Sequence, residues 1–65
     1  MYILTRDELV ENIKVSEGSL DELRSNLVAQ LGHPVADRPA TITEVIDLAS
    51  TAWGVASSDV GLIKA

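Results

Sequence analysis

Residues 41–65, TITEVIDLASTAWGVASSDVGLIKA, carry the clearest structural signals in the chain. Thr41 can cap the free backbone amide of Glu44, and the Glu44 side chain can reach back to Thr41, which makes a capping box. Apolar residues then recur on one face at helical spacing, while polar residues occupy the other face. Gly54 supplies the left-handed residue with which helices commonly end. We therefore predict a helix over residues 42–53 that stops at Gly54.

A second short helix is predicted after this glycine turn. Ser57 or Ser58 offers a new N-terminal cap, and Asp59 falls in the first turn, where the helix dipole favours a negative charge. Apolar side chains follow at Val60, Leu62 and Ile63. These signals predict a helix over residues 58–64.

The chain before residue 15 carries a similar start signal. Thr5 and Glu8 have the spacing of a capping box, and Leu4 and Leu9 have the spacing of a hydrophobic staple around it. Because a short apolar edge follows this signal, we predict a helix over residues 6–14.

A further helix is predicted in the middle of the chain. Ser19 and Glu22 form another capping box, and leucines recur at helical spacing behind it. Gly32 closes this helix, and Pro34 prevents its continuation. The prediction is a helix over residues 20–31, followed by an extended connector.

The predicted fold class is therefore all-α. No alternating run longer than a few residues argues for a β-rich fold. We expect one small helical domain over residues 1–65, built as a bundle of three to four short helices. Their predicted ranges are 6–14, 20–31, 42–53 and 58–64.

The size and composition of the chain favour association. The chain has 65 residues, of which 46% are hydrophobic, and it has no cysteine. A domain of this size buries only about 60% of the surface that its unfolded chain exposes. Small domains often depend on disulfides, metals or association for stability, and disulfides are excluded here. We therefore expect some apolar surface to be buried against a partner, which can be a second copy in a homo-oligomer.

The charge balance bears on the class of partner. The formal net charge is −5, which opposes binding to nucleic-acid phosphates and anionic lipid. No apolar run approaches the roughly 18 residues of a membrane span. We predict a soluble, cytoplasmic protein that has no membrane partner and whose charge disfavours nucleic acid.

Residues for catalysis or cofactor binding are missing from the sequence. The four glycines never form a phosphate-binding loop, and no metal-binding motif is present. The single histidine, His33, leaves too few nitrogen ligands for an ordinary zinc site and has nothing nearby to make it a catalytic base. We predict no catalytic residue, no cofactor and no metal site, and do not expect an enzyme.

Residues 46–64 contain a segment that resembles the helix-turn-helix unit of DNA-binding regulators. The positions that carry the resemblance are Ser50, Gly54, Val55, Val60 and Ile63, with Ala49 and Trp53 as inward-facing neighbours. The resemblance implies a DNA-binding regulator whose helix at 58–64 enters the major groove. Its DNA-contacting residues would be Ser57, Ser58, Lys64 and Arg38.

The leading hypothesis is a small, non-enzymatic helical module that binds another protein. Such a module could be a regulator, an inhibitor or a minor assembly protein, and we expect it to self-associate. Trp53 continues the apolar face of its helix, so it can anchor the core or form the centre of an interface. The predicted partner-binding residues are Leu48, Trp53, Leu62 and Ile63.

Overall fold

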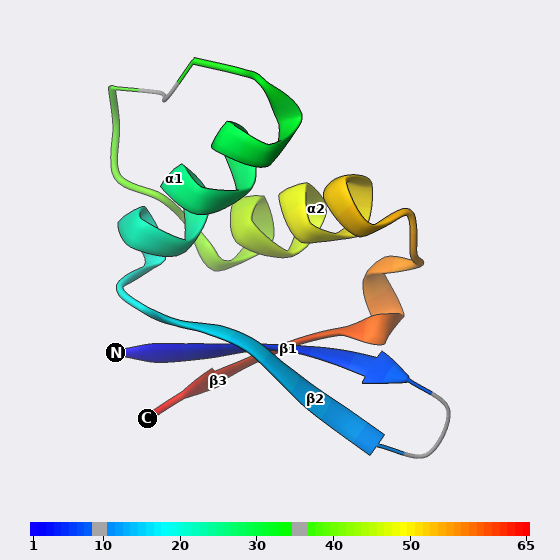
Figure 1. Cartoon of the computed structure of the whole chain (residues 1–65). Helices are drawn as coiled ribbons and strands as arrows, with labels where there is room; N and C mark the ends of the chain where they lie inside the picture. The colour runs from blue at the N-terminus through cyan, green and yellow to red at the C-terminus, as the bar shows by residue number, and fades with distance from the viewer. Residues whose placement is uncertain (9–10, 35–36) are drawn as a thin grey trace.

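A computed structural model describes residues 1–8, 11–34 and 37–65. Its elements in chain order are β1 (Tyr2–Glu8), β2 (Glu11–Gly18), α1 (Leu20–Leu31), α2 (Ile42–Trp53), the short 3-10 helix η1 (Ser57–Asp59) and β3 (Val60–Lys64). The three strands form one antiparallel sheet in the order β2-β1-β3. Both α-helices lie on the same side of this sheet, which gives the molecule two layers (Figure 1).

The all-α prediction is wrong, and the predicted helix over residues 6–14 is one reason. Strands β1 and β2 occupy this part of the chain and pair in register from Tyr2–Gly18 to Glu8–Glu11. Thr5 is buried in β1 and caps no helix. Leu4 is in β1, and its predicted staple partner, Leu9, lies outside the described residues. The capping-box spacing is a local signal, whereas β1 is stabilised by strands on both of its sides.

The predicted helix over residues 58–64 is also wrong. Residues 57–59 form η1, and β3 follows immediately. β3 runs antiparallel to β1, with Leu4 opposite Leu62 and Ile3 opposite Ile63. β-branched residues favour strands and Gly61 weakens a helix, so strand pairing prevails here over the capping signal at the serines.

The two central helix predictions are confirmed, with α1 at residues 20–31 and α2 at residues 42–53. The Ser19 hydroxyl accepts a hydrogen bond from the Glu22 amide at 3.1 Å, and the Glu22 carboxylate accepts one from the Ser19 amide at 3.3 Å. Gly32 and Gly54 end the helices in the left-handed conformation, with φ of 72° and 68°. Both helix ends therefore follow from local sequence.

The core lies between the helices and the sheet. The central strand contributes Leu4, which is 1% exposed, and each helix contributes the residues of its sheet-facing side. The buried cluster consists of Leu4, Leu23, Leu27, Val45, Ala49 and Val60. Residues from four elements, β1, α1, α2 and β3, thus meet in one small core.

A close approach between β1 and β3 depends on Gly61. Gly61 lies opposite Thr5 in the register, and a Cβ atom at Gly61 would overlap the Thr5 hydroxyl oxygen. Thr5 is only 6% exposed, so its side chain has little room to move. The absence of a side chain at residue 61 lets the two strands pair around Thr5.

We expect Gly61→Ala to lower the free energy of unfolding by about 1–3 kcal/mol because it overpacks this contact. Thr5→Ala removes the clashing oxygen, so it should restore much of this loss in the double variant, as measured by urea denaturation. Gly32→Ala is the control. A Cβ there meets no described atom within 4 Å. Its cost of roughly 1–2 kcal/mol should come from backbone strain alone. Equal rescue of both glycine variants by Thr5→Ala would contradict this account.

Candidate interaction surface

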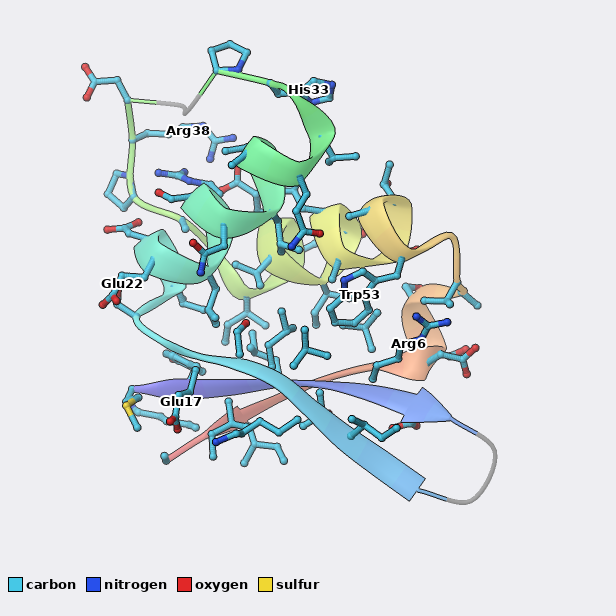
Figure 2. All side chains as sticks on the ribbon, in the orientation of Figure 1. Arg6, Glu17, Glu22, His33, Arg38 and Trp53 are labelled. Atoms are coloured by element: carbon cyan, nitrogen blue, oxygen red, sulfur yellow. The ribbon has the colours of Figure 1, made fainter. Side chains whose placement is uncertain are left out.

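The sheet has one face covered by helices and one face uncovered by any described helix (Figure 1). Successive residues of a strand point to opposite faces, and paired residues share a face. Tyr2 and Leu4 pack toward the helices, so Ile3 and Thr5 point the other way. Figure 2 shows Glu17, the partner of Ile3 in the register, on the side away from the helices. We call this side the outer face; its residues are Ile3, Thr5, Lys14, Glu17, Gly61 and Ile63.

Apolar side chains and one ion pair occupy the outer face. Ile63 is 53% exposed and lies directly across from the half-buried Ile3. Lys14 and Glu17 form an exposed ion pair, with 3.5 Å between Nζ and Oε1. The outer face thus combines exposed aliphatic surface on β3 with paired charges on β2. Ile63 is the most exposed large apolar side chain among those described in the three strands.

The predicted partner-binding residues do not form one surface. Leu48, Trp53 and Leu62 are half-buried and pack against the core cluster. Trp53 points from α2 toward the sheet (Figure 2). Ile63 alone lies on the outer face, because its neighbour Leu62 faces the helices opposite Leu4. The structure therefore brings three of the four residues together around the core and separates Ile63 from them.

The residues of the DNA-binding alternative are separated too. Ser57 and Ser58 lie in η1 and Lys64 lies at the end of β3, so the helix that was to carry them is absent from this segment. Arg38 lies in the connector beyond α1, on the far side of the helical layer from the sheet (Figure 2). Its Nη2 is 2.7 Å from Oε2 of Glu44. The structure provides no recognition helix in the described part of the chain after residue 54.

A cluster of charged residues links Arg38 and Ala40, in the connector between the helices, to α1 and α2. Glu44, at the start of α2, accepts hydrogen bonds from Arg24 at 3.1 Å and from Arg38. The Arg24 side chain is only 4% exposed, and it also donates to the backbone carbonyl of Arg38. Asp21 accepts a hydrogen bond from the Ala40 amide at 2.8 Å. Neutralised by two arginines, Glu44 acts as a structural anchor of the connector.

This cluster differs from the predicted capping box at Thr41. The Thr41 hydroxyl accepts from the Glu44 amide at 3.1 Å, as predicted. The Glu44 side chain, however, bonds to the two arginines, which are charge-assisted partners. The sequence does contain one indication of this cluster, because Arg24 is a cation next to the buried Leu23 and Leu27 of α1. A buried cation requires a carboxylate nearby, although its position in the sequence cannot be deduced from Arg24 alone.

The environment of Glu44 changes its acidity. Burial raises the pKa of the carboxyl, but hydrogen bonds from Arg38 and Arg24 and the charges of these residues lower it more. The pKa therefore lies below its ordinary value of 4.5. A carboxyl with a lowered pKa in the folded state contributes stability that is present above the unfolded pKa. That contribution is lost as the pH falls through the folded pKa.

We expect Glu44→Gln to lower the urea midpoint at pH 7 because it removes the charge shared by two arginines. The difference from the unsubstituted protein should shrink as the pH falls below 4.5 and should disappear only below the lowered pKa at which Glu44 of the folded protein is protonated. Asp47→Asn is the control, since Asp47 is exposed on the same helix and has no ion pair with a described residue. A Glu44→Gln effect that is independent of pH between 2 and 7 would contradict the assignment.

Leu62 and Ile63 provide a test of the two faces. We expect Leu62→Asp to lower the free energy of unfolding by more than about 2 kcal/mol, since it places a charge beside the core. Ile63→Asp should cost less than about 1 kcal/mol because that side chain is half exposed. Urea denaturation followed by circular dichroism measures both values. Equal destabilisation by the two variants would show that the faces are assigned incorrectly.

Other classes of site lack support in the described residues. No group of three or more His, Cys, Asp or Glu side chains there could hold a metal ion. None of the helices in the described ranges is long and apolar enough to cross a membrane. Comparison with protein-family models, with curated proteins and with solved structures finds no match. The uncovered side of the sheet is therefore the candidate functional surface.

Proposed function

We propose that this chain is a small, non-enzymatic protein-interaction module that binds another polypeptide through the outer face. The observation that carries the proposal is the half-exposed Ile63 beside Ile3 on a side of the sheet that no described helix covers. Full burial of an isoleucine side chain contributes about 1.5–3 kcal/mol, so covering the remaining half of Ile63 favours binding. This surface replaces the helix-face docking predicted from the sequence.

The size of the outer face limits the affinity that it can supply. Over the five residues of β3, along which all three strands lie side by side, a strand spacing of about 4.8 Å gives a footprint of roughly 250 Å². A standard interface buries about 800 Å² on each partner. One outer face by itself therefore supports a weak or transient complex, which suits a regulator, an inhibitor or a minor assembly protein. As part of the same proposal we place the protein in the cytoplasm, because a chain without cysteine fits a reducing compartment.

The proposal predicts that partner capture depends on Ile63. The immobilised chain is incubated with cell extract from its source, and captured proteins are quantified by mass spectrometry. Ile63→Asp should reduce recovery of the specific partner at least tenfold, a change of about 1.4 kcal/mol, because a charge replaces buried apolar surface.

Thr43→Asp is the matched control, since it adds the same charge at an exposed position of α2 on the helical side. It should leave recovery unchanged. Equal recovery with both variants, or no specifically captured polypeptide, would refute the outer face as a binding surface. Circular dichroism of each variant verifies that the fold is retained.

A further inference from the structure

The two edges of the sheet differ in their protection against further strand pairing. β2 forms one edge, and its register with β1 shifts between Leu4–Ser16 and Thr5–Lys14, which leaves Val15 as an extra residue. Such bulges and charged side chains are the devices that protect an edge from other strands. β3 forms the other edge, and its register with β1 runs without interruption. β3 is therefore the edge open to another strand.

The hydrogen-bonding groups on the free side of β3 can be identified from the register. The Ala65 amide donates to the Met1 carbonyl at 2.9 Å, so residues 65, 63 and 61 point their backbone groups toward β1. The backbone groups of Lys64, Leu62 and Val60 consequently point away from β1. The Val60 amide is already bonded to the Ser57 carbonyl. Among the described residues, no other strand pairs with this side of β3.

We propose that β3 pairs antiparallel with β3 of a second copy across a two-fold axis at Leu62, joining two sheets into one of six strands. This inference goes beyond the proposed function because it names the second copy and uses the strand edge, a different surface from the outer face. In this register the Leu62 amide and carbonyl of each copy bond to those of the other. The Lys64 amide of each copy bonds to the Val60 carbonyl of the other, which gives four hydrogen bonds in all.

Other registers use the edge less completely. A shift by two residues in either direction keeps outward-pointing groups opposite one another but leaves either Val60 or Lys64 unpaired. Centring on Leu62 engages all five residues of β3 and satisfies the free amides of Leu62 and Lys64. A symmetric interface of this kind needs one surface only, because each copy presents the same groups to the other.

Shape and charge at this edge also fit a second copy. The register places Ile63 on the outer face opposite Gly61 of the other copy, which carries no side chain of its own, and next to the Thr5 side chain that packs over that glycine. The half-exposed Ile63 and the half-buried Leu62 would each gain cover. β3 contains no acidic residue in a chain of net charge −5, and Lys64 would lie next to Asp59 of the other copy. Like-charge repulsion is thereby reduced where the copies meet.

The length of β3 determines how stable such a dimer can be. Five residues at about 3.4 Å each give a seam of roughly 17 Å. One pair of edge strands of this length buries much less area than the approximately 800 Å² per partner of a standard interface. The dimer should therefore be reversible and depend on protein concentration, with the monomer fold intact on dilution.

The test uses the full chain in sedimentation velocity over a series of concentrations, with two variants at residue 64. The unsubstituted protein should shift from monomer to dimer as its concentration rises. Lys64→Pro removes an outward donor and blocks the edge sterically, so it should weaken dimerisation at least tenfold. Lys64→Gln keeps the amide and removes only an exposed charge, so it should weaken dimerisation less than fivefold.

Amide hydrogen exchange of the unsubstituted protein gives a second measurement if Lys64→Pro fails to fold. Protection of the Leu62 and Lys64 amides should rise with protein concentration, whereas that of the Gly61 and Ile63 amides should not depend on it.

A monomer at all concentrations would overturn the proposal, as would dimerisation unaffected by Lys64→Pro or concentration-dependent protection of Gly61 and Ile63. An edge that pairs only with a strand of a different protein would overturn it as well. If dimerisation fails while capture through Ile63 persists, the edge assignment is wrong and the proposed function stands.

Discussion

The antiparallel pairing of β1 with β3 is the constraint on which the rest of the structure depends. It makes β1 the central strand and brings residues 2–6 against residues 60–64. Leu4, at the middle of this pairing, is almost fully buried beneath both helices. The pairing requires chain closure over more than fifty residues, so its entropic cost must be offset by burial of the core that it completes. Gly61 permits this close approach because Thr5 occupies the space where a side chain would lie.

The helical layer is positioned by a different kind of interaction. α1 and α2 pack their apolar sides on the sheet, and the Arg24–Glu44–Arg38 cluster links them to the connector. Arg24 is buried and Glu44 is half-buried, so Arg24 depends on Glu44 for a charged partner. Removing Glu44 would leave the Arg24 charge in a poorly solvated position, a larger penalty than the loss of a surface ion pair. Burial of apolar surface thus joins the layers, while charge pairing fixes the connector over the helices.

Sequence reasoning succeeded where the determinants of structure are local. Caps at Ser19 and Thr41 and glycines at residues 32 and 54 act within one helical turn, and both helices have the predicted bounds. It failed for residues 58–64 because their partner, β1, lies some fifty residues away, and for residues 6–14 because β1 and β2 pair with each other, which the capping-box spacing does not reveal. The candidate surface was missed for the same reason. Leu62 and Ile63 are adjacent in sequence, yet strand geometry sends them to opposite faces, a separation that a helical interpretation hides.

The outer face and the β3 edge together suggest why so small a sheet is left uncovered on one side. A single outer face offers roughly 250 Å², too little for a stable complex, and β3 ends at one margin of that face. Pairing through β3 would place two outer faces side by side in one sheet, with about twice the footprint and with Ile63 of each copy near the centre. A partner that binds this joined surface would also favour the dimer, because it would contact both copies. Edge pairing and face binding would then reinforce each other, and weak contacts on a 65-residue chain could yield a specific assembly.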